Sequence, residues 1–356
     1  QYNVSLTYVG QTVEVTTASQ DVVEQVKKQA FDLYKGGHTA GTSGNATPLE
    51  GVHFEVKLES DIQALVAKGM SLEEAKAAAP LYDELITDKN GQASSIELPY
   101  GTYRVMETVP AEDYNTADDF FVTVTEDSRE HQSFTNNVII DEVFTSYLKI
   151  VKKDAETGKT VQLANTEFKI RTLQDIYVAG KEIKAGEYVG YFTWNPFQGF
   201  WVDEWTTDES GTVMLNEMLP AGDYELVEIN APEGYLLNDE VVEFTISNKG
   251  MMEIAADGNP IITVEKEDIS VKGQITVYKE GEVFTGIHQN DDGSYSFDYE
   301  SKGQSNTEFQ IIADTDILDP SNDGTILYEK DEVVETITTG TNGYATSSKL
   351  PLGEYR

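Results

Sequence analysis

One short motif, Leu-Pro-x-Gly-x-Tyr, occurs three times along this 356-residue chain. The three copies begin at Leu98, Leu219 and Leu350. They are spaced by roughly 120 to 130 residues, which is the length of a small domain. A turn precedes each copy, and its glycine is Gly91, Gly211 or Gly343. Glycine readily takes the positive φ that a tight turn needs. The chain is therefore predicted to contain tandem copies of one domain.

A second signal precedes each copy, namely an alternating apolar stretch that ends in a lysine. These lysines are Lys35, Lys152 and Lys279. Most of the remaining chain also alternates with period 2, as in FEVKL at 54–58 and EFKIRT at 167–172. Short strands separated by Gly, Asn and Asp turns are typical of antiparallel sandwiches. We predict an all-β fold of tandem immunoglobulin-like β-sandwiches.

The repeats set the predicted domain boundaries. The first domain spans 25–143, the second 144–270 and the third, which is truncated, 271–356; residues 1–24 are the last strands of an upstream module or an N-terminal extension. One segment, 61–79, reads as a helix instead. Ser71 and Glu74 have capping-box spacing there, and Pro80 follows as a stop. We predict a helical insertion on a loop of the first sandwich, either covering a sheet edge or binding a ligand.

Composition removes several function classes. With 63 acidic and 25 basic residues the net charge is -38, which disfavours binding to nucleic acid and to anionic membrane surfaces. The absence of cysteine excludes disulfides and thiolate metal sites, and the four histidines are scattered. The acidic loop 314–324 offers oxygen ligands of the kind Ca²⁺ takes but lacks EF-hand spacing. We predict no cofactor, no metal and no membrane insertion.

The middle repeat carries a family resemblance. Its segments YLKIVKKDAETGKTV (147–161) and GDYELVEINAPEGYLL (222–237) resemble Cna protein B-type domains, also called SpaA-like domains, of Gram-positive surface adhesins and pilins. The first repeat shares the likeness through Lys35 and GTYRVMETVPAEDY (101–114), and the third shares it in part. The resemblance implies an internal isopeptide bond. In such domains a lysine on the first strand attacks an Asn or Asp on the last strand, assisted by a buried Glu.

Transferred to this sequence, the resemblance implies a set of reacting residues. The lysines would be Lys35 and Lys152, with Lys279 as their equivalent in the third repeat; the proton shuttles would be Glu107 and Glu228. Counting back eleven residues from the following lysine gives the acceptors Asp141 and Asp268. The rival acceptors are Asn136 and Asn137 in the first domain and Asn259 in the second. The third shuttle would lie beyond Arg356, so that bond cannot close within this sequence.

The implied reaction is physically reasonable. Burial in an apolar core lowers the pKa of a lysine and raises that of a glutamic acid, so a neutral amine and a protonated carboxyl can coexist near neutral pH. Holding amine and carbonyl in contact supplies an effective molarity of roughly 10⁵ M or more. The chain would act once on itself without a cofactor and would not be an enzyme in the usual sense.

An aromatic stretch at 188–205 contains all three tryptophans. Trp205 directly precedes a turn and is expected in the core. Trp194 and Phe197 lie at the Asn-Pro tip of a predicted hairpin, and exposed aromatic side chains there could contact a ligand.

These features favour an extracellular adhesin or stalk, anchored to the cell wall through a C-terminal region outside this sequence. Its partners would be neighbouring domains of the same chain and a host protein or glycan, such as a matrix protein, a glycoprotein or an immunoglobulin. One alternative is a pilus shaft subunit, although no LPxTG-type sorting signal occurs here. The other is a carbohydrate-active enzyme with Asp203 and Glu204 as paired carboxylates.

Overall fold

The computed structural model describes residues 2–3, 19–20, 26–38, 46–194, 198–250 and 252–356. The chain divides into two compact units, Gln1–Phe144 and Thr145–Arg356. Within the described residues there are only two short α-helices, and strands dominate both units, which confirms the predicted all-β class. The segment 1–24 lies almost entirely outside the described residues. The described part of it is the short strand pair β1 (Tyr2–Asn3) and β2 (Ser19–Gln20).

The first unit contains two packed sheets, ordered β11-β10-β6-β7 and β12-β4-β5, with β8 also paired to β4. Their strands are β4 (Asp32–Gly37), β5 (Thr47–Pro48), β6 (His53–Leu58), β7 (Leu81–Ile86), β8 (Gln92–Ser94), β10 (Gly101–Val109), β11 (Phe120–Val124) and β12 (Val138–Asp141); β3 (Lys28–Gln29) pairs with β9 (Leu98–Pro99), and a 3₁₀ turn, η1, spans Phe134–Asn136. Alternate residues of these strands, including Leu33, Phe54 and Val105, form one buried cluster.

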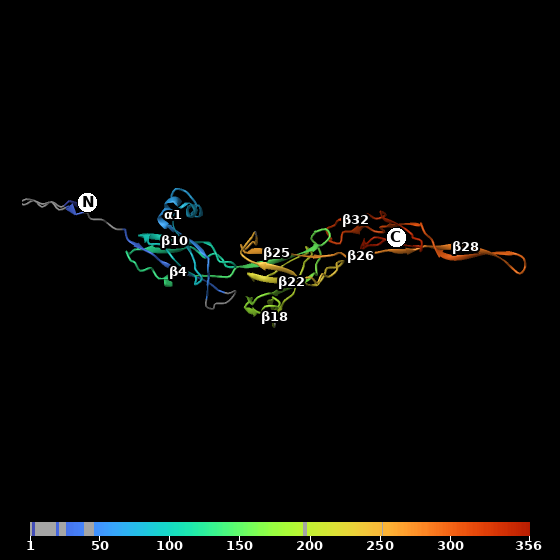
Figure 1. The fold of residues 1–356 in the computed structure, drawn as a ribbon, viewed down its shortest axis with the longest axis horizontal. Coiled ribbons are helices and arrows are strands. Elements are labelled where there is room, and N and C mark those ends of the chain that lie inside the picture. The colour runs from blue at the N-terminus through green and yellow to red at the C-terminus, as the bar shows by residue number, and fades with distance from the viewer. Residues whose placement is uncertain (1, 4–18, 21–25, 39–45, 195–197, 251) are drawn as a thin grey trace, which may run out of the picture. The chain divides into compact units, whose positions relative to one another are not determined.

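The helical insertion consists of two helices, α1 (Glu59–Val66) and α2 (Leu72–Ala78), and not of one continuous helix over 61–79. Gly69 lies between them with a φ of 100°, a left-handed conformation that interrupts the first helix. The Ser71–Glu74 capping box then begins the second helix, as its spacing predicted. Figure 1 shows α1 beside β10, and Arg104 of β10 forms an ion pair with Glu59 at the start of α1.

The second repeat also forms two sheets, ordered β20-β13-β25-β24 and β19-β14-β22-β23, with β21 paired to β13. Their strands are β13 (Thr145–Asp154), β14 (Glu167–Thr172), β19 (Trp205–Thr206), β20 (Thr212–Met214), β21 (Leu219–Pro220), β22 (Gly222–Asn230), β23 (Val242–Ile246), β24 (Glu253–Ile254) and β25 (Pro260–Asp268). Two hairpins are inserted between β14 and β19: β15 (Ile176–Val178) with β16 (Lys181–Ile183), and β17 (Tyr191–Trp194) with β18 (Gly199–Val202).

The first and last strands of each of these sandwiches lie side by side and run parallel. The pair is β4 with β12 in the first repeat and β13 with β25 in the second, whereas the other named strand pairs are antiparallel. Residues aligned on neighbouring strands point to the same face of a sheet. This pairing therefore brings side chains together that lie more than a hundred residues apart in the sequence.

The third repeat completes the second unit with smaller sheets. Its strands are β26 (Lys272–Gly273), β27 (Thr276–Tyr278), β28 (Glu280–Gln289), β29 (Tyr295–Gly303), β30 (Glu308–Ile312), β31 (Ile317–Leu318), β32 (Ile326–Tyr328), β33 (Val333–Thr338), β34 (Tyr344–Thr346) and β35 (Leu350–Pro351). β28 and β29 pair in an antiparallel manner and form a long two-stranded ribbon, in which Figure 1 labels β28. In the described residues β27 pairs only with β34, so this repeat shows no parallel closing strand.

The Leu-Pro-x-Gly-x-Tyr motif builds the same corner three times. The tyrosine hydroxyl donates to the proline carbonyl four residues earlier, from Tyr103, Tyr224 and Tyr355, at 2.7–2.8 Å. The motif leucine is buried in each copy. Because the corner joins two strands and closes the core beneath them, the motif recurs for a structural reason: it stabilises each domain's fold.

Replacing Tyr103 with phenylalanine should cost about 1 kcal/mol of stability, because it removes the hydroxyl that donates to Pro99. Tyr100, in the same motif, is 64% exposed and provides the matched control, since Tyr100→Phe should leave stability unchanged. Chemical denaturation of both variants measures the difference. Equal losses in the two variants would show that the corner hydrogen bond contributes nothing.

Candidate cross-linking sites

In the first sandwich the parallel pair brings a lysine and two carboxyls together. Lys35 on β4 is 2.7 Å from Oε2 of Glu107 on β10 and also forms an ion pair with Oδ1 of Asp141 on β12. All three side chains are at most 1% exposed. Asp141 is aligned with Gly37, two residues after Lys35, so the amine and the acceptor carboxyl lie on the same face.

The second sandwich repeats this arrangement. Lys152 on β13 is 3.0 Å from Oε1 of Glu228 on β22 and 2.7 Å from Oδ1 of Asp268 on β25. The three side chains are fully buried. Asp268 is aligned with Asp154, again two residues after the lysine. Within the described residues neither carboxyl oxygen of Asp268 has a well-aligned hydrogen-bond donor, so the amine is its close polar neighbour.

The turn glycines explain why the lysine and the turn recur together. The backbone N–H of Lys35 donates to the carbonyl of Gly91 at 2.7 Å, and that of Lys152 donates to Gly211 at 2.9 Å. Gly211 has a φ of 72°, and a Cβ there would lie 1.7 Å from the carbonyl oxygen of Val161. Only glycine fits at this position, so the turn fixes the backbone of Lys152.

Burial sets the protonation of both clusters. It raises the pKa of Asp141 to about 6, partly offset by Lys35. In the second cluster burial raises the pKa of Glu228 to about 8; the attraction of Lys152 offsets part of this rise, and the neighbouring Asp268 carboxyl adds to it. Each buried pair of carboxyls thus retains one proton at a pH where an exposed carboxyl is ionised.

In each sandwich a tyrosine that follows the glutamate of the cluster contacts the strand that carries the lysine. Tyr235 donates its hydroxyl to Oδ2 of Asp154 at 2.9 Å in the second sandwich. In the first, the ring of Tyr114 lies against Gly37, where a Cβ would be 2.2 Å from it. Sequence reasoning missed these two tyrosines, although both follow their shuttle glutamate at the same spacing. That spacing was the signal that could have found them.

Two segments of the chain, 39–138 and 146–260, match the SpaA prealbumin-like fold domain, and together they cover more than half of the sequence. The chain belongs to the SpaA family. This confirms the resemblance found in the lysine and tyrosine segments. No curated protein matches the sequence significantly.

Solved structures with similar folds include Gram-positive pilins. The Bacillus anthracis TIE protein is 22% identical with a TM-score of 0.40; the match covers 92% of this chain, which spans 44% of that protein's length. The shaft pilin SpaA of Lactobacillus rhamnosus GG is 23% identical, with a TM-score of 0.26 and coverage of 69% of this chain and 98% of the pilin. GBS52, the minor pilin of Streptococcus agalactiae, is 18% identical, with a TM-score of 0.27 and coverages of 68% and 96%.

Two of the rival asparagine acceptors in these SpaA-like domains, Asn137 and Asn259, hydrogen-bond groups other than the lysines, and the side chain of Asn136 lies outside the described residues. The side-chain amide of Asn137 donates to the carbonyl of Asp32, and that of Asn259 donates to Asp257 within its own turn. The structure brings neither to a buried amine. Lys279 is exposed, and no ion pair joins it to a carboxylate in the described part of the chain. Of the three predicted lysines, only Lys35 and Lys152 lie in a buried cluster.

The aromatic stretch 188–205 includes a buried and an exposed tryptophan. Trp205 is 5% exposed, as expected for a core residue, whereas Trp194 on β17 is 78% exposed. Trp194 lies against Gly199, where a Cβ would be 3.2 Å from the indole. Phe197 lies outside the described residues.

The remaining acidic candidates have lysine partners. In the acidic loop 314–324, Asp319 and Asp323 contact Lys159 at 2.9 and 2.8 Å. Asp203 and Glu204 both contact Lys169, at 3.3 and 3.1 Å. Within the described ranges no group of three or more His, Asp or Glu residues is placed to hold a metal ion. No helix in that part of the chain is long and apolar enough to cross a membrane.

Proposed function

We propose that this chain is part of an extracellular adhesin or stalk of a Gram-positive bacterium, built of tandem sandwiches that cross-link themselves with Lys–Asp isopeptide bonds. The bonds join Lys35 to Asp141 and Lys152 to Asp268. The observation that carries the proposal is that a fully buried lysine contacts one aspartate and one glutamate in both sandwiches. Buried charges are costly unless they are paired, and amide formation removes two of them.

The reaction balances without a co-reactant. After a proton passes from the ammonium to the carboxyl pair, the neutral amine of Lys152 attacks Cγ of Asp268. Glu228, which is protonated, gives its proton to the departing hydroxyl of Asp268 and takes one from the attacking nitrogen, so that one amide and one water form. The contacts of Lys152 with Asp268 at 2.7 Å and with Glu228 at 3.0 Å support these steps.

The bonds have a mechanical role in the proposal. Each joins the first strand of a sandwich to its last, so force that passes along the chain bypasses the intervening residues. It also closes a loop of more than a hundred residues and so restricts the denatured state, as a disulfide would in a chain that has no cysteine.

In this proposal the sandwiches also bind a host protein or glycan through an exposed surface. The exposed Trp194 and the α1–α2 insertion are the candidate surfaces. Binding to matrix proteins, glycoproteins or immunoglobulins before and after replacement of both surfaces separates an adhesin from a passive stalk. A pilus shaft and a carbohydrate-active enzyme remain the alternative functions. For the enzyme the carboxylates would be Asp203 and Glu204, which are paired with Lys169.

The intact mass of the denatured wild-type chain tests the covalent proposal. We expect a deficit of two waters, and tandem mass spectrometry of a digest should identify peptides that join Lys35 to Asp141 and Lys152 to Asp268. Loss of ammonia would instead identify asparagine acceptors. An unshifted mass would exclude the bonds and leave the function of the sandwiches to their loops.

The two bonds should form with different pH limits, because each carboxyl pair must hold a proton for water to leave. This proton is lost as the pH rises through about 6 at Asp141 and about 8 at Glu228. Above its pKa the protonated fraction falls about tenfold per pH unit. Between these two values the first bond should slow steadily relative to the second. A chain kept in urea from its synthesis, diluted into buffers of increasing pH and quenched for mass spectrometry, measures both rates. Parallel pH profiles would contradict this prediction.

A further inference from the structure

Lys266 is a second buried lysine in the second sandwich, and the proposed reaction does not use it. It lies on β25 and is aligned with Lys152 on the neighbouring parallel strand β13. Aligned side chains point to the same face, so both amines enter the same core. Lys266 is 1% exposed, and its ammonium donates to the backbone carbonyl of Glu240. Among the described residues no carboxylate is in direct contact with Lys266, which is uncommon for a buried cation and calls for an explanation.

Charged groups surround Lys266 on every element packed against it. They are Lys152 and Asp154 on β13, Glu228 on β22, Asp268 on β25 and Glu240 in the segment that follows β22. Burial lowers the pKa of Lys266, the carboxylates raise it, and the repulsion from Lys152 lowers it again. Because the two lysines are aligned on neighbouring strands and both are buried in one core, their positive charges repel each other.

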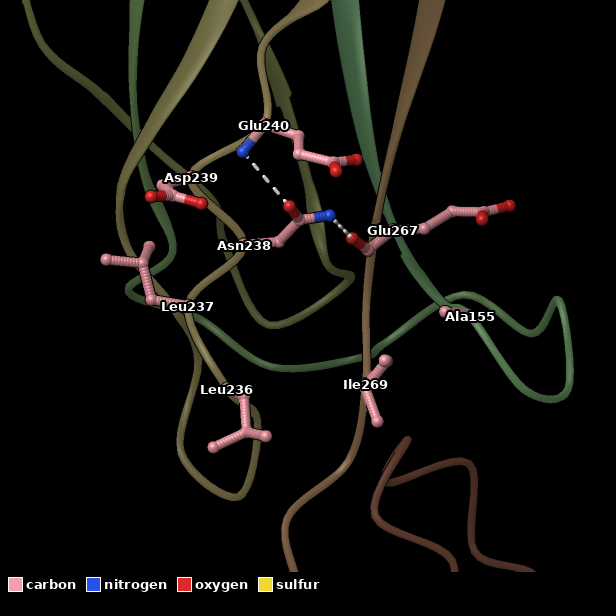
Figure 2. A pocket seen from close by; sticks show the side chains of 8 residues that line it. All are labelled: Ala155, Leu236, Leu237, Asn238, Asp239, Glu240, Glu267 and Ile269. Atoms are coloured by element: carbon pink, nitrogen blue, oxygen red, sulfur yellow. Dashed lines mark hydrogen bonds between the residues drawn. The ribbon is translucent and has the colours of Figure 1, made fainter.

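The acceptor of Lys266 is fixed from outside the core. Figure 2 shows that Asn238 connects the segment that follows β22 to strand β25. Its side-chain amide donates to the carbonyl of Glu267 at 2.9 Å, and its side-chain oxygen accepts from the N–H of Glu240 at 3.1 Å. The pocket drawn there includes Glu267 and Ile269, which alternate with the buried Lys266 and Asp268 along the strand. The pocket and the cluster thus lie on opposite faces of β25, and Asn238 holds the Glu240 carbonyl in place.

The first sandwich lacks this second amine. The residue aligned with Lys35 is Ile139, an apolar side chain. Its shuttle is instead fixed by the backbone, since the N–H of Ala117 donates to Oε2 of Glu107 at 2.9 Å. The same lysine, glutamate and aspartate therefore occur in two different charge environments within one chain.

We propose that Lys266 is a positioning residue for the second bond: its ammonium, held by the Glu240 carbonyl, repels that of Lys152 and so favours release of the proton that Lys152 must lose before it attacks Asp268. A neighbouring cation is an established means of activating a lysine nucleophile. This inference rests on the proposed function, because it concerns the rate of the same reaction.

The test compares refolding time courses of three variants with that of the wild-type chain. Lys266→Gln removes the charge but keeps an N–H donor, Lys266→Arg keeps the charge, and Lys153→Met removes the adjacent outward-facing lysine as a control. Chains held in urea from synthesis are diluted into buffers from acidic to alkaline pH, quenched and analysed by mass spectrometry. The Lys35–Asp141 bond provides an internal reference in every molecule.

We expect Lys266→Gln to slow the second bond about tenfold at neutral pH and to displace the acidic limb of its pH profile upward by about one pH unit. Lys266→Arg and Lys153→Met should behave like the wild type, and the first bond should be unchanged throughout. If Lys266→Gln prevents the second sandwich from folding, as proteolysis would show, Lys266→Met is the replacement variant.

Three outcomes would overturn the inference. An unchanged rate and pH profile would show that Lys266 does not act on Lys152. If Lys266→Gln slows the second bond by the same factor at every pH, without displacing its pH profile, Lys266 has only a structural role. The same conclusion would follow if neither Lys266→Gln nor Lys266→Met folds. A wild-type chain that loses no water would refute the proposed function itself, which distinguishes the two failures.

Discussion

A chain with Lys152→Met is expected to lose the second bond completely and to keep the first, so its mass deficit should fall from two waters to one. Closing a loop of about 100 residues stabilises a fold by roughly 4 to 5 kcal/mol in the chain-entropy description. Glu228 and Asp268 would also remain buried without their cation, which makes the loss larger. We therefore expect the free energy of unfolding of the second sandwich to drop by at least about 4 kcal/mol.

Lys153→Met is the matched control, because Lys153 is adjacent and faces Glu265 on the outer side. It should retain both bonds and nearly full stability. Denaturation followed by proteolysis and mass spectrometry reports the two sandwiches separately. Equal stability of Lys152→Met and Lys153→Met would show that no covalent bond that stabilises the sandwich forms at Lys152.

Much of the clusters could be predicted from the sequence, because their residues lie at fixed distances from recognisable motifs. Glu107 and Glu228 each stand four residues after the motif tyrosine, on a strand whose alternation sets their face. The lysines end apolar stretches of the sequence, and their backbone N–H groups donate to the turn glycines. With the family resemblance, this spacing predicted Lys35, Glu107 and Asp141 as one set, with asparagines as rival acceptors, and the structure brings these three side chains into contact. The same holds for their counterparts in the second repeat.

Other features depend on register between distant strands, which sequence alternation does not fix. The parallel pairing of β13 with β25 determines that Lys266 is aligned with Lys152. Period-2 alternation along β25 could nevertheless have predicted that Lys266 is buried. If Asp268 faces the core, Lys266 two residues earlier must face it too. The prediction of one helix over 61–79 did not include the break between α1 and α2, in which Gly69 takes a left-handed φ.

Replacing Glu228 with glutamine should block the second bond while preserving the shape of the site. Glutamine cannot give a proton to the departing hydroxyl and take one from the Lys152 nitrogen, and positioned general acid–base groups contribute roughly 10²- to 10⁴-fold to such rates. The second bond should therefore form at least about a hundredfold more slowly, with the first unaffected. Glu225→Gln, on the same strand but paired with Arg171 outside the cluster, is the control.

The result also separates two roles of Glu228. If it only paired with the charge of Lys152, loss of its charge would weaken the folded state without changing how the rate depends on pH. A proton shuttle predicts something different: the decline of the wild-type rate above a pH of about 8, where Glu228 loses its proton, should disappear in the variant together with most of the rate. A variant that forms the bond at the wild-type rate would remove Glu228 from the mechanism and leave proximity of Lys152 and Asp268 as its sole basis.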